Sequence, residues 1–206
     1  MKLGEMTFGA NIKIPERQED GSYKLADYTL GYFDAGVAAF IRKDIHSLCR
    51  FGGNVKYAGS DLDERMTEIY NSYPDELKEL IIPSTIPLYN GSGPEDITRK
   101  VFAPTLTMVG CGDNRETEEG LTWPIFTGRN SRKKTFDGSA AFWWLSSQYS
   151  FDGAWGVFTD GSAYYNYPSN SGGVVPAFVI PQSVQIDDTP DNDGSYRLTV
   201  LQSYCS

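Results

Sequence analysis

The chain has 206 residues and a formal net charge of −9, from 27 acidic and 18 basic side chains. Such a surface repels phosphate backbones, so we expect neither a nucleic-acid partner nor attachment to an anionic membrane surface. With 40% hydrophobic and 14% aromatic residues, the chain can bury a packed core and is predicted to fold mainly as one domain. No apolar run is long enough for a signal peptide or a membrane span, so synthesis in the cytoplasm is expected.

The first part of the chain indicates short strands separated by turns. Residues 19–21, Glu-Asp-Gly, are predicted to close a hairpin between strands at 11–16 and 22–28. Frequent glycine and short bursts of aromatic residues between turn-forming residues favour a β-rich, loop-rich fold over a helical bundle. The predicted class is therefore α+β, with short twisted sheets, one or two helices and long loops.

One helix is predicted strongly, beginning after Ser60, whose side chain can cap its N-terminus. Apolar residues recur at spacings of four, three and four and form one stripe: Leu62, Met66, Ile69 and Tyr73. Pro74 ends this helix, and Asp75 is expected to cap a second short helix over residues 76–82.

The second half of the chain indicates loops followed by a hairpin and further strands. Residues 110–134 are polar and loop-like, while 154–158 and 163–167 are predicted to pair through an Asp-Gly turn. The segment 174–180 is almost wholly apolar and is predicted to be one strand buried on both faces. An acidic turn then precedes a last strand over residues 195–206.

Catalytic and metal-binding motifs are absent from the sequence. The single histidine, His46, would have to support any nucleophilic triad alone, and a structural role for it is favoured. Cysteines 49, 111 and 205 are widely spaced and odd in number, so buried free thiols are expected. We therefore predict no catalytic residue, no cofactor and no enzyme activity.

The acidic run after residue 186 resembles a calcium loop only superficially. Placing Gly194 at the invariant glycine of an EF-hand puts Asp191 and Asp193 at ligand positions. The same register puts Thr189 first and Val200 where the bidentate glutamate belongs, so the motif fails at both ends. A solvated turn is predicted, and no metal site.

The segment 146–173 has the composition of a recognition surface, because it is rich in Ser, Gly, Tyr, Asn and Asp and has no Lys, Arg or Glu. Tyrosine supplies rigid contact area at low entropy cost, while Ser, Gly and Asn adapt their hydrogen bonds. The candidate ligand-binding residues are Tyr149, Asp152, Tyr164, Tyr165, Asn166, Tyr167 and Asn170. The alternative, an ordinary hairpin with its aromatic side chains packed inward, is equally open for the tyrosines.

Two further expectations concern the large aromatic residues of this segment. Trp143, Trp144 and Trp155 lie beside a predicted buried strand and are expected in the core. Strand alternation predicts that the neighbours Tyr164 and Tyr165 face opposite sides of their sheet.

Three blocks of sequence resemble a known, poorly characterised family of gut bacteria and their phages. The segments WWLSSQ (143–148), AWGVFTDGS (154–162) and GVVPAFVIP (173–181) are similar to its WWLRSP, AW-V-x-x-x-G and GVRPAL-LP blocks. LGEMTFGANIKI near the N-terminus and RKVFAPTLTMVG (99–110) resemble further blocks of the phage members. The resemblance therefore extends over most of residues 1–181.

The resemblance implies a C-type-lectin-like fold, as in formylglycine-generating enzymes. Residues 1–186 would form that single domain, with 187–206 as a possible appendage. The chain departs from the family at Ser146 and Val175, where the family has arginines, and at Gln148, where it has proline. No arginine-dependent property of the family can therefore be carried over.

The leading hypothesis is a non-enzymatic phage virion protein, on the tail or head exterior, that binds a host surface glycan or protein. A structural decoration or connector protein, with the aromatic hairpin as its subunit interface, is the first alternative. A cell-wall hydrolase using carboxylates is a weaker one. Other virion proteins and further copies of the same chain are the expected partners, and the virion is the expected location.

Overall fold

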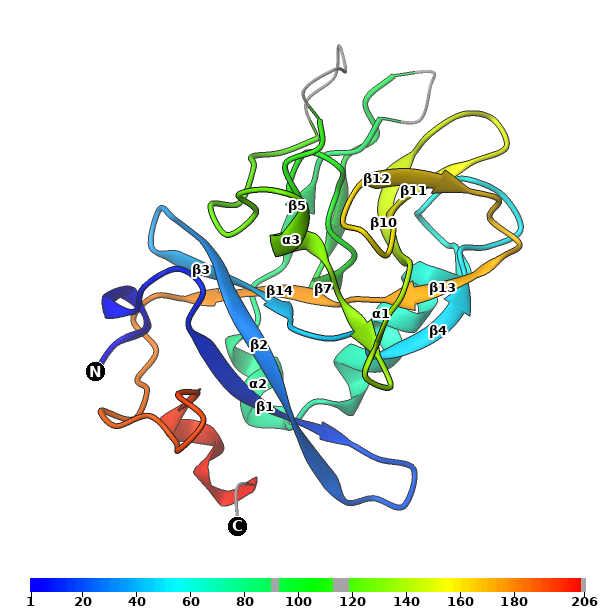
Figure 1. The fold of residues 1–206 in the computed structure, drawn as a ribbon. Helices are drawn as coiled ribbons and strands as arrows, with labels where there is room; N and C mark the ends of the chain where they lie inside the picture. The colour runs from blue at the N-terminus through cyan, green and yellow to red at the C-terminus, as the bar shows by residue number, and fades with distance from the viewer. Residues whose placement is uncertain (90–92, 113–118, 205–206) are drawn as a thin grey trace.

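The computed structural model describes residues 1–89, 93–112 and 119–204 and shows a mixed α+β fold built mainly from strands (Figure 1). One sheet contains β1 (Asn11–Arg17), β2 (Tyr23–Asp34), β3 (Val37–Arg42), β7 (Val101–Phe102), β14 (Ala177–Pro181) and β15 (Tyr196–Arg197). A second contains β4 (Ser47–Arg50), β10 (Trp143–Gln148), β11 (Ala154–Val157), β12 (Ala163–Asn166) and β13 (Ser171–Val174). Two small ribbons pair β5 (Ser84–Ile86) with β6 (Ile97–Arg99), and β8 (Thr135–Phe136) with β9 (Ser139–Ala140).

Helices are few and short. They are α1 (Asp61–Ser72), α2 (Asp75–Leu80) and α3 (Arg129–Arg132), with 3₁₀ turns η1 (Leu3–Glu5) and η2 (Thr199–Tyr204). The six-stranded sheet has the order β15-β1-β2-β3-β14-β7, and the five-stranded sheet the order β12-β11-β10-β13-β4. The strands β12 and β4 are therefore the edges of the second sheet.

Both predicted hairpins are confirmed. The strands β1 and β2 pair antiparallel from Asn11↔Thr29 to Arg17↔Tyr23, with a turn at the predicted Glu-Asp-Gly. The strands β11 and β12 pair antiparallel from Ala154↔Asn166 to Val157↔Ala163. Each pairing follows from local sequence, because turn residues separate two short strand-forming segments.

The helix α1 begins where its sequence predicts. The Ser60 hydroxyl accepts a hydrogen bond from the Asp63 amide at 3.2 Å, and all four residues of the predicted apolar stripe are buried. The Asp63 carboxylate binds the Arg99 guanidinium at 2.6 and 2.7 Å, which joins α1 to β6. The helix α2 starts one residue earlier than predicted, so Pro74 occupies the N-cap and Asp75 lies inside the helix.

The apolar segment 174–180 is two strands, not the one that its composition predicts. The strand β13 pairs with β10 and β4, whereas β14 pairs with β3 and β7. Pro176 has no amide hydrogen, so no ladder can continue through it, and the chain passes from one sheet to the other at this point. This connected pair of strands joins the two sheets in Figure 1.

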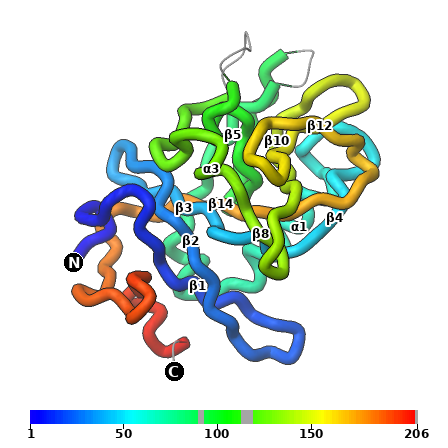
Figure 2. Tube along the Cα trace, viewed as in Figure 1, coloured from blue at the N-terminus to red at the C-terminus, as the bar shows by residue number. Residues whose placement is uncertain are grey.

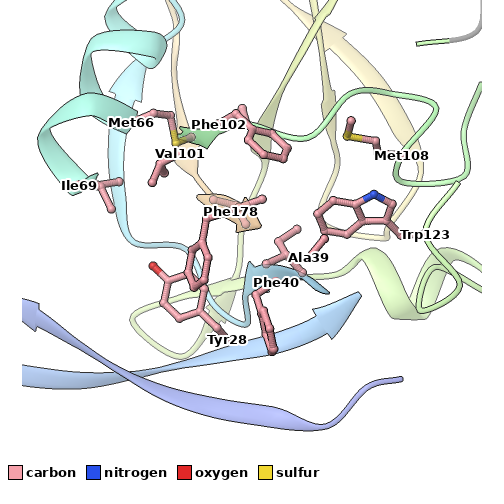
Figure 3. Close-up of a cluster of buried hydrophobic side chains, with 14 of the residues drawn as sticks. Tyr28, Ala39, Phe40, Met66, Ile69, Val101, Phe102, Met108, Trp123 and Phe178 are labelled. Atoms are coloured by element: carbon pink, nitrogen blue, oxygen red, sulfur yellow. The ribbon is translucent and has the colours of Figure 1, made fainter. Parts of the chain in front are cut away.

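Phe178 on β14 lies at the centre of the core (Figure 3). Its ring centroid is 5.2 Å from that of Tyr28, 5.9 Å from that of Phe40 and 5.9 Å from that of Tyr73. Trp123 packs on Gly31 of β2, where a β-carbon would lie 2.4 Å from the indole ring. The loop before α3 is therefore fixed to the sheet by a contact that only glycine allows.

The C-terminal segment packs against the first sheet. The strand β15 runs parallel to β1, and Leu198 and Leu201 are fully buried. The predicted last strand is thus limited to two residues and is followed by η2, while Cys205 lies outside the described residues. The N-terminus and η2 lie on the same side of the molecule in Figure 2.

Cys49 is free and only partly buried, and burial raises the pKa of its thiol to about 11. Such a thiol is unreactive at neutral pH. Cys111 is also only partly buried, and its thiol donates to the Val109 carbonyl at 3.9 Å. Over the described ranges, no helix has the length and hydropathy needed to cross a bilayer.

Candidate functional site

A row of aromatic rings lies along the β10–β11–β12 end of the second sheet. We call Phe158, Tyr164, Tyr165, Tyr149 and Trp155, in that spatial order, the aromatic row. Tyr149 and Tyr165 stack with centroids 4.1 Å apart and planes 11° apart, and Tyr164 continues the stack at 5.4 Å and 13°. Phe158 packs on Tyr164 at 5.5 Å, and Trp155 meets Tyr149 edge-on at 4.8 Å. Each ring is therefore held in place by its neighbours before any ligand binds.

The short connection between β10 and β11 positions the centre of this row. The amides of Tyr149 and Ser150 both donate to the Gly153 carbonyl, at 2.9 and 3.2 Å, and turn the chain back. A β-carbon on Gly153 would lie 3.1 Å from the Tyr149 ring and 3.2 Å from the Tyr165 ring. Glycine at this position therefore leaves the space in which the two tyrosines stack.

Tyr164 and Tyr165 do not point to opposite sides as strand alternation predicts; their rings are nearly parallel and adjacent. The strand β12 is an edge strand, so the space beside it is open, and long side chains from both faces can converge there. Strand alternation determines the face from which a side chain leaves the backbone, but it does not determine the position of the ring at the end of a long side chain.

The rings of the row are unusually exposed for their size. The exposed fraction is 53% for Tyr164, 42% for Tyr149 and 45% for Phe158. In the described part of the chain, the hydroxyls of Tyr149, Tyr164 and Tyr165 have no hydrogen-bond partner and remain available to a ligand. The neighbouring phenols of Tyr149 and then Tyr164 raise the pKa of Tyr165, because a phenolate there would be repelled.

The other predicted site residues lie around this row. Tyr167 is 58% exposed, and Asp152 is exposed and accepts a hydrogen bond from the Ser150 hydroxyl at 2.7 Å. The Asn166 side-chain oxygen accepts from the Asn170 amide at 2.6 Å, which links these two residues. The structure therefore brings the tyrosines together and leaves the polar residues at the periphery.

Two of the three tryptophans are buried as predicted, and one is not. Trp143 and Trp144 are fully buried, and their indole N–H groups donate to the carbonyls of Arg132 and Cys49, at 3.0 and 3.1 Å. Trp155 is only partly buried: it packs against the hydrophobic core and also meets Tyr149 of the aromatic row, so its expected place in the core is confirmed only in part. It lies on β11, next to the edge strand β12.

Sequence reasoning missed Phe151 and Phe158. Phe151 is 89% exposed in the connection between β10 and β11, and Phe158 lies at the start of the hairpin turn. Phe151 lies within a short turn rich in Ser, Asp and Gly, and Phe158 directly precedes another, and these positions are the signal that could have marked them as exposed.

Two of the three positions that differ from the resembled family, Ser146 and Val175, are internal, whereas Gln148 is only partly buried. Val175 is fully buried between β13 and β14, and Ser146 is 2% exposed on β10. The Ser146 hydroxyl has no hydrogen-bond partner within the described ranges. Its neighbour Ser147 instead donates to the Glu119 carboxylate and accepts from the Leu106 amide at 2.8 Å.

His46 lies beside a buried ionic cluster, away from the aromatic row. Its Nε2 atom is 4.0 Å from the Glu16 carboxylate, which also binds Arg42 at 2.9 and 3.1 Å and accepts from the Tyr28 hydroxyl. Burial lowers the pKa of His46, so the ring is neutral at pH 7. The cluster links β1, β2 and β3 through Glu16, Tyr28 and Arg42, and such an arrangement is consistent with the structural role expected for His46.

The acidic residues of the run after residue 186 bind separate partners. Arg197 binds Asp191 at 2.8 Å, and Lys13 binds Asp193 at 2.5 Å. Among the described residues, no group of three or more His, Cys, Asp or Glu side chains is placed to hold a metal.

The fold and site together define an α+β protein with an exposed, pre-stacked aromatic surface on a small sheet. Residues 36–182 match the family described as "Domain of unknown function (DUF6273)", and the chain belongs to this family. The aromatic row lies wholly inside the matched range, whereas β1 and β15 lie outside it. No curated protein and no solved structure matches the chain.

Proposed function

We propose that the protein is a non-enzymatic recognition protein of a phage virion, and that its aromatic row binds a component of the host cell surface. One observation carries the proposal: several large rings, each about half exposed, are stacked on one another at the edge of a sheet. Solvent-exposed aromatic residues cost free energy unless a partner covers them, and contiguous ones mark interaction sites.

The fixed, stacked conformation of the rings in the aromatic row also supports a role in recognition. Side chains that are already stacked lose little conformational entropy on binding, which leaves more of the contact energy as affinity. The free phenol hydroxyls can hydrogen-bond either a glycan or a protein. The segment has no basic side chain from residue 135 to 195, which argues against an anionic polymer as the ligand of this row.

The proposal has two more specific parts: the protein belongs to a virion, and its fold is C-type-lectin-like. Support for both comes from the resemblance of the three sequence blocks, and from two linked sheets with two main helices and long irregular segments. In such a fold the buried blocks around Trp144 and Phe178 serve as the framework, and the connections between strands carry the contacts.

The test is the binding of labelled protein to a panel of intact bacterial cells. We expect Tyr149→Ala/Tyr165→Ala to reduce binding about tenfold, which corresponds to losing about 1.4 kcal/mol of contact energy. Tyr23→Ala is the matched control, because Tyr23 is 36% exposed but packs on Tyr204, far along the chain from the row. Equal binding by wild type and the double variant, or absence of the protein from purified virions, would contradict the proposal.

A structural decoration or connector role is the second candidate, favoured by the location of the row at the free edge strand β12. Edge strands and aromatic surfaces both pair readily with further copies of a chain. Light scattering separates the two roles. If the wild-type protein is an oligomer and the double variant is a monomer, the aromatic row is a subunit interface. If both proteins are monomers, the result supports recognition.

A further inference from the structure

A hollow with a volume of about 230 Å³ is lined by residues of β2, β3 and α3 and of the loops beside them, and no residue of the aromatic row borders it. The residues around it are Gly9, Thr29, Ile41, Lys43, Ile125, Phe126, Ser131, Lys133 and Lys134. Three of these are lysines and none is acidic, in a protein whose net charge is −9. We call this hollow the three-lysine pocket.

The buried lysine of the pocket is incompletely neutralised. Lys134 is 7% exposed, and its ammonium donates to the carbonyls of Arg42 and Lys43, at 2.7 and 3.0 Å. The ammonium nitrogen also lies 5.7 Å from the centroid of the Trp143 ring, a cation–π contact, and among the described residues no carboxylate lies within 4 Å of it. Burial lowers the pKa of Lys134 to about 7, and only the nearby Asp44 opposes this effect by its charge.

The two other lysines are exposed at the mouth. Lys43 has one distant carboxylate, that of Asp27 at 3.8 Å, and Lys133 has none within 4 Å in the described part of the chain. Both cations can therefore turn to a ligand at small cost, because exposed ion pairs are worth little.

The remaining polar groups of the pocket are already engaged. The Thr29 hydroxyl donates to Asn11 at 2.8 Å, and the Ser131 hydroxyl donates to the Gly128 carbonyl at 2.7 Å. The backbone amides of Gly9 and Lys43 also donate to carbonyls within the protein, each at 2.9 Å. Phosphate sites typically offer several free backbone amides, whereas at least four amides of this pocket, those of Gly9, Lys43, Phe126 and Ser131, already donate to carbonyls.

We propose that the three-lysine pocket binds a small organic carboxylate. Its charged end lies between Lys43 and Lys133, above the buried ammonium of Lys134. Its apolar body lies against Ile41, Ile125 and Phe126. The volume is below the range usual for drug-sized ligands, so the ligand is small. This inference is independent of the aromatic row and of what that row binds.

The test is isothermal titration calorimetry with three probes: benzoate, its neutral analogue benzamide, and inorganic phosphate. We expect saturable benzoate binding that is about fivefold tighter than benzamide binding, with phosphate weaker than benzoate. Lys43→Met/Lys133→Met should lower benzoate affinity about fivefold and leave benzamide affinity unchanged. Lys24→Met, another exposed lysine of β2 outside this pocket, is the matched charge control and should change neither.

A second variant tests the apolar half of the pocket. Ile125→Ala should weaken benzoate and benzamide equally, and circular dichroism verifies that each variant remains folded. Three results would overturn the proposal: no saturable benzoate binding, equal affinity for benzoate and benzamide, or phosphate binding as tightly as benzoate.

Discussion

The strand β10 and the hairpin β11–β12 both carry large aromatic residues, but those of β10 are buried whereas those of β12 are exposed. Trp143 and Trp144 are fully buried, and each satisfies its indole N–H with a backbone carbonyl. Tyr164 and Tyr165, two strands away, are exposed, and their rings contact one another and the neighbouring rings of Phe158 and Tyr149. Position within the sheet explains the difference: β10 is central and covered on both faces, whereas β12 is an edge. Aromatic content alone therefore does not distinguish a core from a contact surface.

The largest effect on the free energy of unfolding is expected from a substitution of a buried tryptophan on β10. Trp144→Ala should lower the free energy of unfolding by about 3–5 kcal/mol, because it leaves a large cavity beside Phe51 and Phe142. Urea unfolding monitored by circular dichroism gives the value. A loss below about 1 kcal/mol would mean that β10 is not the packed centre of its sheet.

Two neighbouring serines on β10 provide a more closely matched pair of variants. Ser147→Ala should cost about 1–3 kcal/mol, because it leaves the buried Glu119 carboxylate and the Leu106 amide short of a partner. Ser146→Ala should change stability by less than about 0.5 kcal/mol, since its hydroxyl is buried without a partner among the described residues. Equal losses in the two variants, measured by the same unfolding experiment, would contradict this assignment of hydrogen bonds.

The buried cation beside Trp143 predicts a pH dependence. The pKa of Lys134 is about 7 in the folded protein and near 10.5 in the unfolded chain. Between these values the unfolded chain holds a proton that the folded chain lacks, so the free energy of unfolding rises with pH. The slope is at most about 1.4 kcal/mol per pH unit for one proton.

Lys134→Met isolates this contribution. The difference in unfolding free energy between wild type and variant, measured from pH 6 to pH 10, should grow in favour of wild type above about pH 7. A difference that stays constant over this range would show that the lysine keeps its ordinary pKa in the folded protein.

The smallest effects on stability are expected in the aromatic row. Tyr165→Ala should cost about 1 kcal/mol, the contribution of its ring contacts, and Tyr165→Phe almost nothing, because the hydroxyl is free within the described chain. Thermal and urea unfolding measure both. A loss near that of Trp144→Ala would place Tyr165 in the framework instead of on a contact surface.

Local features of the fold were predictable from the sequence. The cap at Ser60 and the stripe from Leu62 to Tyr73 specify α1 without reference to the rest of the chain. Turn residues specify both hairpins in the same way. What could not be predicted depends on distant partners, such as the division of 174–180 between two sheets.

The candidate site was predicted in its composition but not in its geometry. The tyrosines from 149 to 167 were identified because recognition surfaces favour that residue type. Their stacking, the exposure of Phe158 and the partly buried position of Trp155 follow from β12 being an edge, and strand order is not local information. The three-lysine pocket has the same origin, because β2, β3 and the segment after α3 meet there only in the folded chain.

Hydroxyl-radical footprinting of the purified protein tests the central claim most directly, by comparing tyrosines within one molecule. The account predicts rapid labelling of Tyr149, Tyr164, Tyr165 and Tyr167, no labelling of the buried Tyr28, Tyr57 and Tyr73, and protection of the first group when cells are bound. Protection of Tyr164 and Tyr165 in the free protein, or their continued labelling on the cell surface, would contradict it.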